Sequence, residues 1–407
     1  MDKLRSVSSP PVAGPKLRLD SIDIFRGLAA LSVALYHIWG HDGAYAFPSN
    51  GLVPQSTHIE LFTYLISPLR WGYLGVSLFL VLSGFCIHLP YARKKYAQGN
   101  YTFEAKPFFS RRIRRLYPAY FVAVIGTAAI IKLVSFYPQF HVEEHFGIPT
   151  MWDVASHLTM LHGFIDSQFY SIASVFWSLS LEFQLYLAYP LFLNSFKKFG
   201  IGKSVIALIN LCIVWRFVAV YAMGAGLISV AATGPYVPMG ILPARMAEWL
   251  VGAYLAEVFA RYYSANKANH PFKEKRTLLF IGSIIAFAIA IGTTFSQLTW
   301  AMTDPLFGLS FALLIAAVIL PSIGVIRHAS QRKLAKPFIQ LGIVSYSFYL
   351  IHSQFGWIVA HFFPSQENAF GFLIIRLFFM LVSLVPIYYF YKFFEKPFLF
   401  PKARQTK

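Results

Sequence analysis

The sequence predicts an all-α membrane protein, a polytopic bundle of about ten transmembrane helices with both termini in the cytoplasm. Of its 407 residues, 57% are hydrophobic and only 13% are charged, whereas soluble domains carry about 25% charged residues. Apolar runs of about 20 residues, long enough to cross a bilayer, recur along the whole chain. The net charge of +18 is concentrated in alternate connecting segments.

Ten runs have the length and composition of a span. They cover residues 22–40, 72–90, 117–136, 174–195, 204–223, 240–260, 277–293, 305–325, 338–360 and 370–394. We expect residues 1–18 to be a disordered cytoplasmic tail, 19–400 the transmembrane domain and 401–407 a second cytoplasmic tail. The first run is too long for a cleavable signal peptide, so we expect it to stay as an anchor.

Charge placement orients these spans. With the N-terminus in the cytoplasm, 28 of the 35 Lys and Arg residues fall in cytoplasmic segments, which is a strong positive-inside pattern. The basic charge is therefore explained by topology and lipid contact rather than by nucleic acid. A multi-pass protein of a cell inner (plasma) membrane is expected. Its two cysteines lie within apolar runs and are expected to be buried, unpaired thiols.

The first span carries two ionisable residues that draw attention. Ionisable groups inside a bilayer are costly and by default indicate function. Arg26 and His37 lie eleven residues apart, which is about three helical turns, so both face one side at a separation of about 16 Å. A lone buried histidine would more simply bond a neighbouring helix, but its companions favour catalysis.

Glu182 in the fourth span is a candidate partner for His37. Helical rise places Glu182 about 18 Å and His37 about 22 Å above the cytoplasmic face, so they can meet if their helices adjoin. In the ninth span, Ser345, Tyr349 and His352 share overlapping faces, and His352 lies near the level of His37. Either His352 pairs with polar groups of the bundle, or it lines a substrate path.

A cluster of arginines begins the third span. Arg112 and Arg115 are helical neighbours within it. The cluster is either a positive-inside stop beside anionic lipids or a clamp for phosphate groups, which planar guanidinium forks bind well.

Two further polar features have simpler interpretations. Arg245 and Glu248 in the sixth span are expected to form an ion pair. The outer loop 137–173 contains several histidines and carboxylates without metal-binding spacing, so we expect a substrate-binding flap or interfacial helix and no metal.

Seven segments together resemble the acyltransferase 3 family of integral membrane acyltransferases, over about residues 19–400. In order, they are FRGLAALSVALYH, GVSLFLVLSGFCI, FFSRRIRRLYPAY, WSLSLEFQLYLAYP, RMAEWLVGAYLA, GIVSYSFYLIH and FFEKPFL. The resemblance implies transfer of an acyl group, commonly acetyl from cytoplasmic acetyl-CoA, to a hydroxyl of a glycan or glycolipid at the outer face.

The resemblance also implies site residues. The arginine–ten residues–histidine motif of the family matches Arg26 and His37, and its arginine-x-x-arginine motif matches Arg112 and Arg115. A third element matches Trp177, Ser178 and Glu182. Many members have two adjacent acids where this chain has Glu182 and Phe183. Many also carry a C-terminal esterase-like domain, and we expect none here because the chain ends soon after the tenth span.

These observations give one working hypothesis, a membrane-embedded O-acyltransferase. Acyl-CoA docks from the cytoplasm, with its phosphates on Arg26, Arg112 and Arg115. His37 acts as general base and Glu182 orients it; an acyl-histidine intermediate is the variant. The residues expected to line the substrate path are Trp177, Ser178, Tyr349 and His352.

The competing hypothesis is a proton-coupled transporter or a flippase, because buried Arg, Glu and His residues also serve carriers. Against it, the sequence has no repeated half and no paired broken helices. The sequence does not select the acyl group or the acceptor, which would be a cell-surface or exported glycan or a lipid-linked saccharide.

Overall fold

A computed structural model of the protein describes residues 19–40, 67–137, 147–228, 236–264, 271–272, 274–321, 333–362 and 369–399. The expected tails at 1–18 and 401–407 lie outside these ranges, as do His141 and His145 of the outer loop. Every regular element within the described ranges is a helix, which confirms the all-α prediction.

Each of the ten predicted spans contains a long helix in the described part of the chain. The long helices are α1 (Asp20–Gly40), α3 (Gly75–Gln98), α4 (Ala105–Val134), α7 (Trp177–Phe199), α8 (Ile201–Gly224), α10 (Leu242–Ser264), α11 (Arg276–Thr293), α13 (Thr303–Ile319), α15 (Ser345–Phe362) and α16 (Ala369–Phe390). The shorter ones are η1 (Ser67–Leu74), α6 (Met151–Leu158), η3 (His162–Phe164), η4 (Asp166–Gln168), α9 (Tyr236–Gly240), α12 (Gln297–Trp300), η6 (Lys333–Ala335), α14 (Lys336–Ile343), η7 (Tyr391–Glu395) and α17 (Lys396–Leu399).

Five helices of the described chain are long and apolar enough to cross a membrane, or six if one bent pair is a single span. These helices support a membrane protein. The number of ten transmembrane helices and the cytoplasmic location of both termini stay predictions. The bent pair replaces the straight helix predicted at 338–360, where α14 and α15 meet at 76°. At the bend, the Ser345 hydroxyl donates a hydrogen bond to the Gly342 carbonyl at 2.8 Å. In a continuous helix, that carbonyl would accept from the backbone amide of the residue four positions later.

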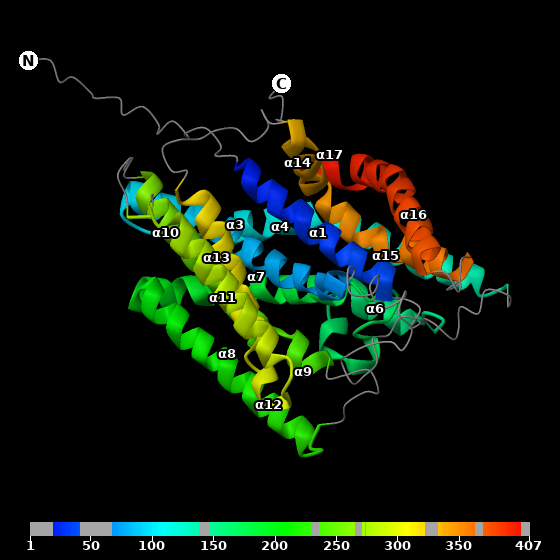
Figure 1. The fold of residues 1–407 in the computed structure, drawn as a ribbon, viewed down its shortest axis with the longest axis horizontal. Helices are drawn as coiled ribbons and strands as arrows, with labels where there is room; N and C mark the ends of the chain where they lie inside the picture. Colours follow the sequence, from blue (N-terminus) through cyan, green and yellow to red (C-terminus); the bar gives the residue numbers. More distant parts are fainter. Residues whose placement is uncertain are drawn as a thin grey trace, which may run out of the picture.

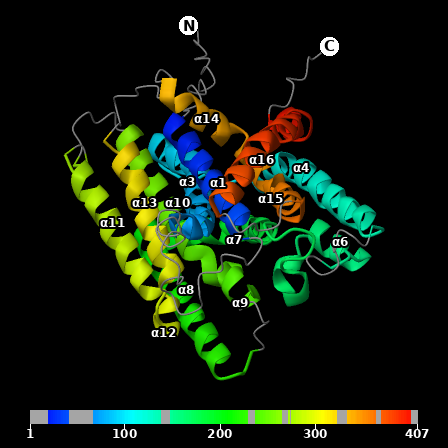
Figure 2. The same cartoon turned by 45° about the vertical axis from the view of Figure 1, so that its right-hand side comes forward.

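Helices α1 and α3 lie at the centre of the bundle. Figures 1 and 2 show α8, α10, α11 and α13 on one side of them and α4, α15 and α16 on the other. Helix α3 packs closely along α10, because a Cβ at Gly84 would lie 1.9 Å from the Trp249 carbonyl oxygen and one at Gly252 would lie 2.0 Å from the Val81 carbonyl oxygen. Only glycine allows two membrane helices to approach so closely.

A buried ionic cluster joins α8, α10 and α13. The predicted pair of Arg245 and Glu248 is present at 2.7 Å. Asp304 of α13 binds both arginines of the cluster, Arg216 at 2.8 Å and Arg245 at 3.0 Å. The sequence indicated the local pair but not Asp304, because its partners lie far away in the chain.

The glycine contact predicts a specific loss of stability. Gly252→Ala should force α10 away from the α3 backbone, and overpacking of this kind typically costs about 1–3 kcal/mol. Thermal unfolding in detergent should show a lower Tm. The matched control is Gly126→Ala in α4, where a Cβ meets no atom within 4 Å and the Tm should not fall. An equal loss in both variants would contradict the close-packing argument.

Candidate active site

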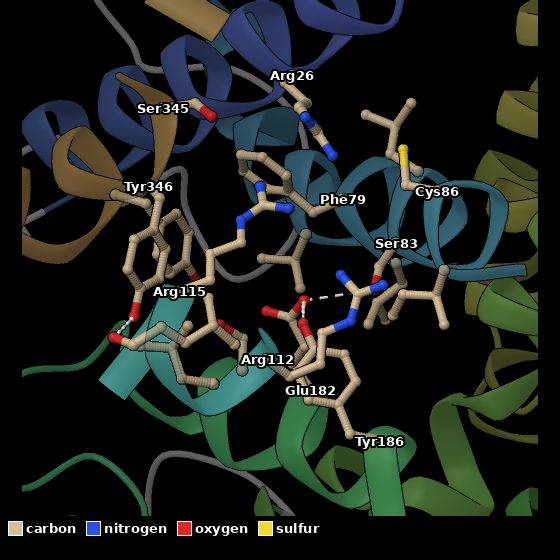
Figure 3. Close-up of a pocket in the computed structure, with 18 residues that line it drawn as sticks. Arg26, Phe79, Ser83, Cys86, Arg112, Arg115, Glu182, Tyr186, Ser345 and Tyr346 are labelled. Atoms are coloured by element: carbon tan, nitrogen blue, oxygen red, sulfur yellow. Dashed lines mark hydrogen bonds between the residues drawn. The ribbon is translucent and has the colours of Figure 1, made fainter. Parts of the chain in front are cut away.

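Helices α1, α3, α4, α7 and α15 enclose a cavity of about 110 Å³. Its charged lining consists of Arg26, Arg112, Arg115 and Glu182, which Figure 3 shows converging from three helices. Along α3 the lining runs from Val76 to Ile87, which corresponds to about 16 Å of helix. The cavity is therefore elongated along α3. The structure brings together both predicted arginine motifs and the predicted carboxylate.

Positive charge is in excess around this cavity. Three guanidinium groups face it against the single carboxylate of Glu182, while Arg26 also has an ion pair with Asp23 at 3.7 Å. The Nε atoms of Arg112 and Arg115 are buried and make no hydrogen bond within the described chain. Buried charged donors without acceptors are unfavourable unless an anion completes them. This arrangement suits an anionic ligand.

Glu182 of α7 is the one carboxylate among the described residues that line the cavity. Its Oε1 accepts a hydrogen bond from Ser83 at 3.3 Å and another from Tyr186, as Figure 3 shows. Among the described residues no hydrogen bond joins Glu182 to His37, so the structure does not show the direct contact expected between them. Helix α3 lies between α1 and α7 and supplies Ser83 (Figure 1). Helical rise predicted similar depths in the membrane for Glu182 and His37, but depth alone does not determine which helices are neighbours.

His37 instead meets a second histidine. Its Nδ1 lies 2.8 Å from the Val33 carbonyl oxygen and 3.4 Å from Nε2 of His352. The two ring centroids are 5.2 Å apart. The structure therefore shows His352 paired with His37 within the bundle. A role for His352 in lining a substrate path stays a prediction.

Ser178 and Tyr349 connect the cavity with this histidine pair. Both line the cavity, and their hydroxyl oxygens are 2.7 Å apart. The Tyr349 ring also contacts the His352 ring, with centroids 5.7 Å apart. One tyrosine thus separates the cavity from the imidazoles.

Trp177, which the sequence predicts to line the substrate path, is not among the residues that line this cavity. Its ring stacks on Phe169, with centroids 5.6 Å apart and planes at 21°. The Arg245 guanidinium lies 5.8 Å from the Trp177 ring centroid. The Trp177 ring therefore packs at the start of α7 between Phe169 and the buried ionic cluster.

Segment 147–176, which precedes α7, contains a second histidine pair. The rings of His157 and His162 stack with centroids 3.9 Å apart and planes at 6°. His162 Nε2 donates to the Phe176 carbonyl at 3.1 Å, which docks this segment on the first residue before α7. Burial lowers the pKa of His157 to about 4 and that of His162 to about 3. Both imidazoles are therefore neutral near pH 7. No group of three potential metal ligands occurs among the described residues.

Comparison with known proteins assigns the family. The family model described as "Acyltransferase domain" (acyltransferase 3) matches residues 19–392. The chain belongs to the acyltransferase 3 family. Family membership makes it a transferase of acyl groups, and both arginine motifs at the cavity lie inside the matched range.

Several relatives of this acyltransferase 3 chain carry related names. A predicted acetyltransferase of Acidianus two-tailed virus is 26% identical over 80% of this chain and 80% of its own length. The peptidoglycan O-acetyltransferase OatA of Listeria monocytogenes is 26% identical over 82% of this chain and 48% of its own length. The O-acetyltransferase OatA of Staphylococcus aureus is 26% identical over 77% and 49%. The chain thus spans about half the length of the OatA proteins. No solved structure matches it.

The stacked pair of His157 and His162 predicts that the protein loses stability in mild acid. An unfolded histidine has a pKa of about 6.5, so between that pH and the lowered native pKa values the unfolded state binds more protons than the native state. Stability is therefore complete above pH 6.5 and falls as the pH falls below it, by up to about 1.4 kcal/mol per pH unit for each histidine. Thermal unfolding followed between pH 7 and pH 5 should show this decline.

The control for this prediction removes one titrating ring. His157→Gln should make the decline shallower over the same range. Asp153, whose backbone carbonyl lies 2.8 Å from His157 Nδ1, adds little, because carboxylates titrate mostly below about pH 5. A Tm that does not change between pH 7 and pH 5 in the unsubstituted protein would contradict the prediction.

Proposed function

We propose that the protein is a membrane-embedded O-acyltransferase. It moves an acyl group, in the simplest case acetyl, from cytoplasmic acyl-CoA to a hydroxyl of a cell-surface or exported glycan. The observation that carries this proposal is the elongated cavity with three guanidinium groups, two of which have buried Nε donors without acceptors. The names of the OatA relatives support O-acetyl transfer to a glycan.

The donor would enter with its phosphates on the arginines. Arg112 and Arg115 provide forked donors that match phosphate oxygens, and Arg26 adds a third positive charge at the same cavity. The cavity stretches along α3, and a linear chain would fit along it. The pantetheine arm is such a chain, and it would carry the thioester toward Tyr349 while the adenosine part stays outside.

The acyl transfer would take place at His37. Its imidazole accepts the proton of the acceptor hydroxyl while that oxygen attacks the thioester carbonyl carbon. The carbon–sulfur bond then breaks, and the leaving CoA thiolate takes the proton back from His37. In the covalent variant, His37 itself attacks the thioester and the acyl group passes to the hydroxyl in a second step. Glu182 would balance the arginine charge and hold Tyr186 rather than contact the imidazole.

A carrier is the second candidate because of the bend between α14 and α15, since broken helices are typical of transporters. In the described part of the chain only one such bent pair occurs, whereas inverted-repeat carriers have corresponding pairs. Consumption of acetyl-CoA by the purified protein in detergent, with no gradient present, distinguishes the enzyme from the carrier.

The phosphate clamp predicts a selective effect of one arginine. Arg115→Ala should raise the KM for acetyl-CoA by about 10- to 100-fold, because a hydrogen bond to a charged group contributes about 1.5–3 kcal/mol. Arg114→Ala is the matched control, since the Arg114 side chain is exposed and does not line the cavity. Steady-state kinetics in lipid nanodiscs measures both variants. Equal KM values in the two variants would refute the clamp.

The general-base hypothesis predicts loss of transfer in His37→Ala. Radiolabelled acetyl-CoA is incubated with purified protein in nanodiscs, and CoA release and labelled product are followed. The variant should still bind CoA, because the three arginines remain, but it should neither release CoA nor transfer the label. Transfer by a folded His37→Ala protein would exclude His37 as the base. Absence of both CoA binding and CoA release in the unsubstituted protein would favour the carrier.

A further inference from the structure

The contacts of His352 determine where its proton lies. Its Nδ1 is 3.1 Å from the Phe348 carbonyl oxygen and 2.9 Å from the Tyr349 carbonyl oxygen. Carbonyl oxygens only accept, so Nδ1 must carry the hydrogen. In the neutral ring, Nε2 then carries the lone pair. That nitrogen is the one that faces His37.

The same reasoning applies to His37. Its Nδ1 faces two acceptors, the Val33 carbonyl oxygen at 2.8 Å and the lone pair of His352 Nε2 at 3.4 Å. The hydrogen of neutral His37 therefore lies on Nδ1, and its lone pair lies on Nε2. The longer of the two contacts is typical of catalytic hydrogen bonds in a protein without substrate, which tighten when the reactants bind.

His352 is held firmly in this orientation. Its side chain is only 3% exposed, and its ring lies parallel to that of Phe348, with centroids 5.7 Å apart and planes at 10°. The first turn of α15 is itself fixed, because the amide of Ser347 donates to Glu395 at 3.1 Å and its hydroxyl donates to the same oxygen. A ring fixed in this way can set the plane of its neighbour.

We propose that His352 is a positioning residue for His37. Together with the Val33 carbonyl, it holds His37 with the hydrogen on Nδ1, so that Nε2 is the nitrogen that takes the proton of the acceptor hydroxyl. When Nε2 takes that proton, both nitrogens of His37 carry hydrogen, and the lone pair of His352 stabilises the positive charge. This is the role that carboxylates have in hydrolase triads, here performed by a second imidazole. The kinetic consequence rests on the proposed function, whereas the proton positions do not.

Two variants separate positioning from packing. His352→Gln keeps an acceptor, because its amide oxygen can reach the place of Nε2. His352→Leu fills a similar volume without one. Nitrogen-15 NMR of histidine-labelled protein in lipid bilayers reports which ring nitrogens carry hydrogen, and the spectrum of His37→Gln identifies the His37 signals.

The expected NMR result is a protonated Nδ1 in His37 of all three proteins, because the Val33 carbonyl still accepts, and a shifted Nδ1 signal in His352→Leu, where the imidazole acceptor is lost. A hydrogen on Nε2 of His37 in the unsubstituted protein, or an unchanged His37 spectrum in His352→Leu, would overturn the proposal. This measurement needs no turnover, so it decides the proton positions even if the protein transfers no acyl group.

The kinetic result should agree with the spectra. In His352→Leu, kcat should fall by about 10- to 100-fold, as is usual when a supporting partner of a functional group is removed, while the KM for acetyl-CoA stays the same. His352→Gln should recover most of kcat. A purely packing role would lower the Tm in both variants without recovery by Gln, and that pattern, or a folded Leu variant with full kcat, would refute the positioning role.

Discussion

The architecture depends on backbone contact along α3. Glycines on this helix allow two neighbours to touch it from different sides: a Cβ at Gly75 would lie 2.4 Å from the Ala29 carbonyl oxygen of α1, and one at Gly84 would lie 1.9 Å from the Trp249 carbonyl oxygen of α10. Ser83 and Phe79 lie on α3 between these contacts and line the cavity. Because backbones rather than flexible side chains define the spacing, the cavity walls are held at fixed distances.

The two groups of buried charges differ in their balance. In the cluster of α8, α10 and α13, two arginines face two carboxylates, and Arg216 also donates to the carbonyls of Ala301 and Ala244. The charges of this group balance within the protein and tie helices together, although Arg245 Nε and Glu248 Oε2 make no hydrogen bond within the described chain. Around the cavity, three arginines face one carboxylate, and two Nε donors have no acceptor. The excess of positive charge, rather than the unpaired Nε donors, distinguishes a site suited to an anion from a structural network.

The helices, one ion pair and one arginine motif could be predicted from the sequence. Apolar run length located all ten long helical regions, helical spacing gave the pair of Arg245 and Glu248, and the arginine spacing placed Arg112 and Arg115 on one side of α4. Contacts between distant segments were not accessible. Membrane depth is one coordinate, so it placed Glu182 and His352 equally near the level of His37, and only the packing of α1 against α15 selects His352. The bend at Val344 also depends on tertiary contact, because a Cβ at Gly342 would lie 1.8 Å from the Asp23 carbonyl oxygen of α1.

Because of that bend, the two ends of α1 pack against two different helices. Around Asp23 and Gly27, α1 rests on α14, since a Cβ at Gly27 would lie 2.6 Å from the Phe338 carbonyl oxygen. Farther along, at His37, it rests on α15. A straight helix would have coupled both ends of α1 to one rigid rod. Two helices with a joint between them instead support the arginine end and the imidazole end of α1 separately.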